Sequence, residues 1–287
     1  MLNEQAIAQA AVTSLQAEVQ LAPKPGLVDP ESNGAHRDMD VTTFAASIEA
    51  LTPYFQQYFH AGVVAKTVPD LYRQLRAIGI AAENAMLAAT AGVNTHRGAN
   101  FSFGFLLGAL GWLMQQQSLQ QIVTADFAPL FPTVAQVTQG VAGDFRDLEK
   151  KARWSHGEAL YVKHGVTGVR GEALAGYPTI RHVILPYLRK TARRGDMRYL
   201  RLMVHLMAQV EDANVLHRGG PKGLRFVQDA AKTLLHVPDS HLPHALRQLN
   251  AEMITFNLSP GGTADYLSLA YFFFSFTCLA TTNSQPD

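Results

Sequence analysis

The segment 4-EQAIAQAAVTSLQAEVQ-20 decides the fold class of this chain. Its apolar residues recur at spacings of three and four, which is typical of one buried face of an α-helix. That face consists of Ala8, Ala11, Val12, Leu15 and Val19. Alternating β-branched runs bounded by hairpin turns are hard to find in the rest of the chain. We therefore predict an all-α protein.

The same periodicity continues along the chain, interrupted by glycine and proline. It predicts further helices over residues 41–66, 69–91, 102–117, 133–141, 146–164, 180–191, 196–212, 223–236, 241–257 and 263–281. No internal repeat, low-complexity tract or long linker separates these segments. We expect one compact multi-helix domain over residues 1–287.

The composition limits the classes of ligand. Hydrophobic residues make up 47% of the 287 residues and charged residues 16%, which favours a well-buried globular chain over a disordered one. The 24 basic and 23 acidic residues leave a net charge of +1. Such a chain has no overall field that would attract nucleic acid or an anionic membrane. An anionic ligand must therefore be held by a local cluster of cations.

Three features of the sequence predict a cytoplasmic location. A single cysteine excludes an intrachain disulfide, which suits a reducing compartment. The first 20 residues carry acids and glutamines where a signal peptide has a basic and then an apolar region. The most apolar stretch, residues 266–280, is shorter than the ~20 residues that span a bilayer.

Polar residues gather between the predicted helices, in five segments that contain glycine. These joints hold more Gly, His, Asn, Asp and Arg than a simple connection needs. A ligand at such a joint can be met by backbone N–H groups and by oriented side chains. We therefore expect a ligand site built from interhelical loops and helix ends.

The first segment covers residues 24–40. Lys24 can be presented to a phosphate there, and Asp38 can bind a hard cation. The alternative is ordinary turn chemistry, with Asp40 capping the next helix.

The second segment, residues 92–101, has glycines on both sides of Asn94, His96 and Arg97. A tight bend there would leave N–H groups free beside the Arg97 guanidinium, which suits a phosphate or a ribose. A helix C-cap followed by a polar turn is the simpler alternative. Upstream, Glu83 lies in an otherwise apolar helix, where a carboxylate is costly unless it is paired, bound to metal or exposed at the helix edge.

The third segment, residues 165–173, is expected to be a flexible glycine loop. Arg170 can bind a phosphate from it and Glu172 a cation. The spacing of its glycines lacks the preceding strand of a dinucleotide-binding fold, so we predict no such fold.

The fourth and fifth segments lie near the C-terminal end. Glu211 and Asp212 are expected at a helix C-terminus, where the helix dipole disfavours acids, and this favours a Mg²⁺ site beside Arg218 and Lys222. A solvated helix end is the alternative. In residues 257–265, Ser259 and the following Pro and Gly residues predict a helix start whose amides can bind an anion or simply form a cap.

Together the five segments resemble the triphosphoribosyl-dephospho-coenzyme A synthases, a family that serves citrate lyase and, in a close relative, malonate decarboxylase. The resemblance rests on KPGLVD with NGAHRDMD, GVNTHRGANF, GVRGEA, EDANVLHRGG and NLSPGGTADYL. These strings occur in this order over residues 22–270, which is almost the whole chain.

The resemblance implies a reaction at C1′ of ATP. The ribose 2′-hydroxyl of 3′-dephospho-coenzyme A would attack this carbon, adenine would leave, and the triphosphate would stay on the transferred sugar. The product would be the precursor of the citrate lyase prosthetic group, passed on to a carrier-protein transferase. The implied cofactor is Mg²⁺. The sequence leaves open whether the protein is a homodimer.

Roles follow for the candidate residues. Glu83 or His96 would be the general base. Substrate and phosphate binding would fall to Lys24, Asn94, Arg97, Arg170, Arg218, Lys222 and Ser259. The metal or its waters would be held by Asp38, Glu172, Glu211 and Asp212. Three alternatives stay open: the malonate decarboxylase counterpart of the same reaction, a metal-dependent N-glycoside hydrolase of nucleotides, and a noncatalytic nucleotide-binding chaperone of the carrier protein.

Overall fold

The helix predicted over residues 4–20 forms as α1 (Glu4–Gln20), and the predicted stripe is its buried face. The computed structural model describes residues 4–145, 148, 154 and 156–282. Within those ranges the chain contains helices and no β-strand, apart from one isolated bridge between Asp29 and Ser32. The all-α prediction is confirmed.

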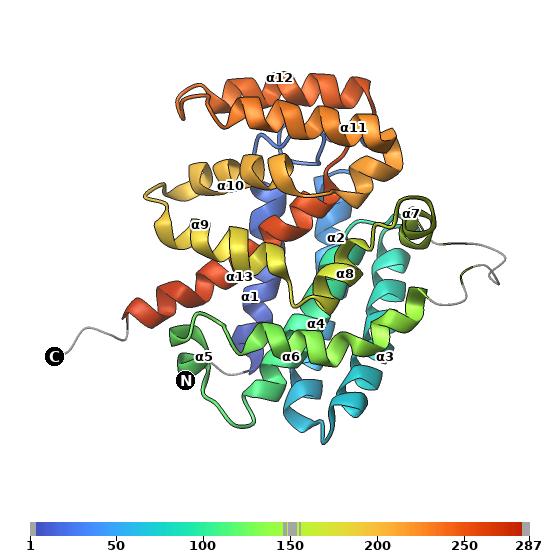
Figure 1. Ribbon diagram of the computed structural model, residues 1–287, viewed down its shortest axis with the longest axis vertical. Coiled ribbons are helices and arrows are strands. Elements are labelled where there is room, and N and C mark those ends of the chain that lie inside the picture. The colour runs from blue at the N-terminus through green and yellow to red at the C-terminus, as the bar shows by residue number, and fades with distance from the viewer. Residues whose placement is uncertain (1–3, 146–147, 149–153, 155, 283–287) are drawn as a thin grey trace.

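The other helices are best read along the colour gradient of Figure 1. They are α2 (Val41–Val64), α3 (Val68–Ala89), α4 (Arg97–Leu113), α5 (Leu119–Thr124), α6 (Leu130–Val137), the 3-10 helix η1 (Thr138–Phe145), α7 (His156–His164), α8 (Gly168–Leu174), the π-helical turn η3 (Ile180–Ile184), α9 (Leu185–Lys190), α10 (Gly195–Gln209), α11 (Ala213–Leu234), α12 (Leu242–Thr255) and α13 (Gly261–Thr282). The first half of the helix predicted over 146–164 falls largely outside the described residues.

Helix α13 runs through the middle of the molecule (Figure 1), and its Phe272, Phe273 and Phe276 belong to the main hydrophobic core. It packs against α1, α4, α10 and α11. Phe272 meets Phe103 of α4 edge to face, with ring centroids 5.3 Å apart, and Phe273 meets Phe127 at 4.8 Å. This packing brings the beginning and the end of the chain together. None of the helices in the described ranges is long and apolar enough to cross a membrane.

Glycines bring α2 and α4 into close backbone contact. A Cβ atom on Gly62 would lie 2.1 Å from the Gly108 carbonyl oxygen, and one on Gly111 would lie 2.2 Å from the Phe59 carbonyl oxygen. No larger residue fits at such distances, so the glycines of α4 are required by packing. Nearby, the Tyr58 hydroxyl of α2 donates to Asn100 Oδ1 at 2.9 Å.

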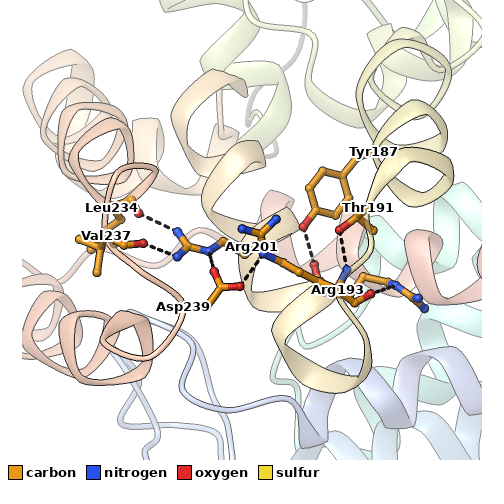
Figure 2. A network of polar contacts seen from close by, with 8 residues as sticks. Tyr187, Thr191, Arg193, Arg201, Leu234, Val237 and Asp239 are labelled. Carbon is orange, nitrogen blue, oxygen red and sulfur yellow. Dashed lines mark hydrogen bonds and ion pairs between the residues drawn. The ribbon is translucent and has the colours of Figure 1, made fainter.

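A buried arginine ties α10 to the turn between α11 and α12. Arg201 donates to the carbonyl oxygens of Leu234 and Val237 and, at 2.6 Å, to the carboxylate of Asp239, as Figure 2 shows. Asp239 also accepts from Arg193 at 2.8 Å. A buried charge is tolerated when its donors are satisfied in this way. The network is structural and lies outside the cavity described below.

Several predicted boundaries were wrong, and three of them bear on the site. Helix α4 begins at Arg97, because Asn94 Oδ1 accepts the Arg97 N–H at 3.2 Å. Residues 168–174, expected as part of a flexible loop, form α8. The helix predicted to end at residue 212 ends at Gln209, and α11 begins at Ala213. The cap predicted at Asp40 is confirmed, because its carboxylate accepts the Thr43 N–H at 2.9 Å.

Candidate active site

One cavity of about 760 Å³ is lined by residues from all five glycine-containing segments. A volume of this size suits a ligand larger than a single nucleotide base. The N-terminal ends of α4, α11 and α13 meet at its wall. The prediction that loops and helix ends converge on one site is confirmed.

Most of the predicted site residues lie in the cavity wall. They are Asp38, Glu83, Asn94, His96, Arg97, Arg170, Arg218 and Ser259. Five others do not line it: Lys24, Glu172, Glu211, Asp212 and Lys222.

Two ion-pair groups hold three arginines of the wall. Arg97 Nη2 lies 2.7 Å from Glu83 Oε1, so the Glu83 carboxylate on α3 is paired with a cation. Arg170 Nε and Arg76 Nη1 both lie 3.1 Å from Asp144 Oδ2. Arg76 was not predicted, although it lies seven residues before Glu83 on the same face of α3. The spare N–H donors of such pairs are available to a phosphate.

Arg218, His36 and Ser259 form a chain of hydrogen bonds in the wall. Arg218 Nη1 donates to the Ala35 carbonyl oxygen at 2.9 Å and to Asn257 Oδ1 at 3.0 Å. Arg218 Nη2 lies 3.2 Å from His36 Nδ1, and His36 Nε2 lies 2.8 Å from Ser259 Oγ. Burial, aided by the Arg218 charge, lowers the pKa of His36 to about 4, so the ring is neutral at pH 7.

His96 is the N-cap residue of α4 and is only 3% exposed. Its Nδ1 lies 2.7 Å from Ser47 Oγ, which also accepts from the Thr95 hydroxyl at 2.7 Å, and its ring packs edge-on against Phe44. Its Nε2 has no hydrogen-bond partner among the described residues. Burial lowers the pKa of His96 to about 3, so the imidazole is neutral and weakly basic.

Asp212 was predicted to hold a metal ion, but its carboxylate caps two helices. Its Oδ1 accepts the N–H groups of Asn214 and Val215 at 2.9 and 3.2 Å, so it is the N-cap of α11. Its Oδ2 accepts the Thr263 N–H at 2.8 Å and so also caps α13. The sequence analysis placed this acid at a helix C-terminus, whereas it lies at two N-termini, where the helix dipole favours an acid. Its Oδ2 also accepts from the Thr263 hydroxyl, and Asp212 does not line the cavity.

Asp265, near the start of α13, is a wall residue outside the predicted set. Its carboxylate accepts the Ala99 N–H at the start of α4, and protein surrounds it except on the side of the cavity. A Cβ atom on Gly98 would lie 2.0 Å from Asp265 Oδ2, so Gly98 leaves the space that this carboxylate fills. Burial, with Asp212 and Glu18 nearby, raises the pKa of Asp265 well above its usual range.

Lys24 is buried beneath the cavity and is not presented to it. Its ammonium group forms an ion pair with the Glu18 carboxylate and donates to the Glu18 carbonyl oxygen at 2.6 Å. A fully buried ammonium group requires such a partner. Glu18, from the last turn of α1, reaches the wall and was not predicted.

The remaining predicted residues also lie apart from the wall. The Glu172 carboxylate accepts the N–H and hydroxyl of Thr179 at 3.2 and 2.9 Å and so fastens α8 to the segment before η3. Glu211 and Lys222 are exposed. Because α8 is helical, Arg170 and Glu172 point in different directions, and only Arg170 reaches the cavity.

The four predicted metal ligands do not come together. Among the described residues, no group of three or more His, Cys, Asp or Glu side chains is placed to hold a metal ion. Mg²⁺ at a nucleotide site needs only one or two carboxylates, since phosphate oxygens and waters complete its shell. Asp38 fits this requirement, because it lines the cavity, its side chain is 63% exposed, and its carboxylate is 3.8 Å from the neutral His36 ring.

Part of the wall is apolar. It is formed by Leu75, Ile80, Phe101, Phe105, Leu160, Val166 and Val169. The cavity therefore has a charged side and an apolar side, which suits a ligand with both phosphate groups and uncharged portions.

Comparison with known proteins agrees with this geometry. The family model of ATP:dephospho-CoA triphosphoribosyl transferases matches residues 4–283. The chain belongs to this family. A probable 2-(5''-triphosphoribosyl)-3'-dephosphocoenzyme-A synthase of Streptococcus equi subsp. equi is 45% identical to it, over 93% of this chain and 95% of that protein. The synthases of Pectobacterium atrosepticum and Haemophilus ducreyi are 42% and 38% identical, each over 94% of this chain and covering 89% and 88% of those proteins. No solved structure matches the chain significantly.

Because the chain belongs to a transferase family, the cavity is the candidate active site of a transferase. Every segment that carried the resemblance contributes to the same wall, so the similarity to the family and the geometry converge on one place.

Proposed function

We propose that this protein transfers the triphosphoribosyl group of ATP to 3′-dephospho-coenzyme A and releases adenine. In this reaction the 2′-hydroxyl oxygen of 3′-dephospho-coenzyme A bonds to C1′ of ATP while the bond from C1′ to adenine breaks. The hydroxyl proton passes to a base, and adenine leaves with a proton. The observation that carries the proposal is the single cavity with a cationic side and an apolar side, in a chain of the transferase family.

The cationic side suits the triphosphate. Arg218 and the paired Arg97 and Arg170 offer N–H donors to its oxygens. Asn94 and Ser259 lie in the same wall and offer neutral polar groups. Holding both substrates in one cavity would supply the proximity that this bimolecular step needs.

Glu83 is the better of the two proposed bases. The low pKa of His96 makes its imidazole a weak proton acceptor at neutral pH. Glu83 is one-third exposed, and Arg97 orients its carboxylate at the cavity wall. We assign Glu83 to the 2′-hydroxyl proton and the unpartnered Nε2 of His96 to a hydrogen bond with substrate.

Mg²⁺ belongs to the proposal as the counter-ion of the triphosphate, with Asp38 as its protein ligand. The metal would neutralise phosphate charge, and Asp38 would fix its position. Chelation with EDTA is expected to stop transfer, and added MgCl₂ to restore it.

The test is to incubate the protein with ATP and 3′-dephospho-coenzyme A, together and separately, and to identify products by mass spectrometry. Transfer predicts adenine only when both are present, with a product that carries both substrate masses less that of adenine. Adenine from ATP alone would indicate the N-glycoside hydrolase, and ATP binding without adenine the noncatalytic chaperone.

The biological setting is proposed on the resemblance alone. We propose a cytoplasmic enzyme whose product goes to a carrier-protein transferase and serves citrate lyase, with the malonate decarboxylase counterpart as the alternative. Purification of the product and its use by each carrier system would distinguish the two.

A further inference from the structure

We propose that His36 is a positioning residue that fixes the Ser259 hydroxyl as a hydrogen-bond donor to a polyphosphate oxygen in the cavity. The inference rests on the proposed function and adds a role for His36, which touches Ser259 and Arg218.

The direction of the hydrogen-bond chain follows from what each group can do. A guanidinium group has only donors, so Arg218 Nη2 donates to His36 Nδ1, and this nitrogen must carry a lone pair. A neutral imidazole with a bare Nδ1 has its proton on Nε2. His36 Nε2 therefore donates to Ser259 Oγ at 2.8 Å. The opposite arrangement would place the Nδ1 proton against the N–H groups of Arg218.

Asp38 does not reverse this direction. Its Oδ1 lies 3.8 Å from His36 Nδ1, beyond hydrogen-bond distance, whereas Arg218 lies within it at 3.2 Å. Arg218 is itself held by the Ala35 carbonyl oxygen and Asn257 Oδ1, so it cannot turn away from the ring without losing these bonds.

Because Ser259 Oγ accepts from His36, its own proton must be donated elsewhere. Ser259 is 2% exposed, and within the described part of the chain His36 is its one hydrogen-bond partner. Ser259 lines the cavity just before α13 begins. The acceptor for its proton is thus a ligand atom on the cationic side of the cavity. A phosphate oxygen, which is anionic and only accepts, fits that position.

Two substitutions at His36 test separately the two hydrogen bonds of its ring, one with Arg218 and one with Ser259. In His36→Asn the side-chain oxygen can take the place of Nδ1 and accept from Arg218, but nothing reaches Ser259. In His36→Gln the longer side chain can place its amide nitrogen near the position of Nε2 and donate to Ser259 Oγ. Ser259→Ala removes the hydroxyl directly. His60→Asn, at an exposed histidine of α2, is the matched control.

Tripolyphosphate binding by calorimetry measures the interaction without the reaction. We expect Ser259→Ala and His36→Asn each to weaken binding about tenfold or more, as for a hydrogen bond to a charged group. His36→Gln and His60→Asn should bind nearly as the wild type does. The double variant His36→Asn/Ser259→Ala should be no weaker than either single one, because the two residues act in series.

The substrate that supplies the phosphate is found from steady-state kinetics. A raised KM for ATP in Ser259→Ala assigns the hydroxyl to the triphosphate, and a raised KM for 3′-dephospho-coenzyme A assigns it to the diphosphate. Equal losses in His36→Asn and His36→Gln, unchanged binding in Ser259→Ala, or no tripolyphosphate binding by the wild type would each overturn the proposal. Transfer by a wild type whose Ser259→Ala variant is unaffected would refute the role of His36 and leave the proposed function intact.

Discussion

The Asp212 carboxylate accepts the Thr263 N–H at 2.8 Å, so the side chain that begins α11 also begins α13. Asp265, two residues after Thr263, in turn accepts the Ala99 N–H of α4. Asp212 and Asp265 thus join the N-termini of α4, α11 and α13 at the cavity.

Asp212→Ala should destabilise the protein by about 2–4 kcal/mol, because two helices lose a cap and buried N–H groups lose their acceptor. Asp212→Asn should fall between this variant and the wild type, since its amide oxygen can still cap α11 while its NH₂ group faces the Thr263 N–H. Urea unfolding measures both. Asp40→Ala removes the cap of α2 alone and should cost less. Equal losses at Asp40 and Asp212 would contradict the double cap.

Asp265→Asn should change how stability depends on pH. Because the folded-state pKa of Asp265 is raised, the folded protein favours the protonated acid. The stability from this preference is present below the ordinary pKa of Asp and is lost as pH rises toward the folded-state pKa. An asparagine lacks this loss, so the Tm of the variant relative to wild type should increase from pH 4 to pH 8. Melting temperatures that change in parallel with pH in the variant and the wild type would contradict a raised pKa of Asp265.

Gly98→Ala should lower both stability and activity. The added methyl group would lie 2.0 Å from Asp265 Oδ2 and must displace the carboxylate or α4, at a cost of about 1–3 kcal/mol. A second change, Asp265→Ala, should restore the melting temperature without restoring turnover. Gly143→Ala is the control, because no atom lies within 4 Å of its added carbon. A Gly98→Ala enzyme with normal melting and turnover would show that the contact is unimportant.

Glu83→Gln should reduce kcat about 100-fold or more if the carboxylate takes the 2′-hydroxyl proton, in the range usual for a general base. Gln keeps a hydrogen-bonding oxygen for Arg97, so the KM for ATP should change much less. Arg97→Ala is the comparison variant, because loss of the guanidinium group should raise the KM for ATP. Full turnover of Glu83→Gln at saturating ATP would exclude Glu83 as the base.

The sequence was most informative where local rules govern structure. The periodicity of residues 4–20 predicted α1 and its end at Gln20, and glycine and proline indicated the joints that meet at the cavity. The roles of single side chains were harder to predict, because they depend on distant partners. Asp212 was placed at the wrong kind of helix end because the preceding helix was predicted to continue to residue 212, whereas it ends at Gln209. The second helix that Asp212 caps could not be predicted, because Thr263 is 51 residues away. Lys24 was predicted to bind a phosphate because the sequence does not show that Glu18 is buried beside it as its ion-pair partner.

The wall of the cavity includes Leu15 near one end of the chain and Ser268 near the other. During translation the site therefore stays incomplete until Ser268 has left the ribosome. A fragment that stops before α13 keeps Ser259 but lacks the cavity-lining residues Gly262 and Asp265 and the Phe side chains that α13 adds to the core. A nascent chain therefore completes this cavity in one late step, when α13 packs against α1 and α4.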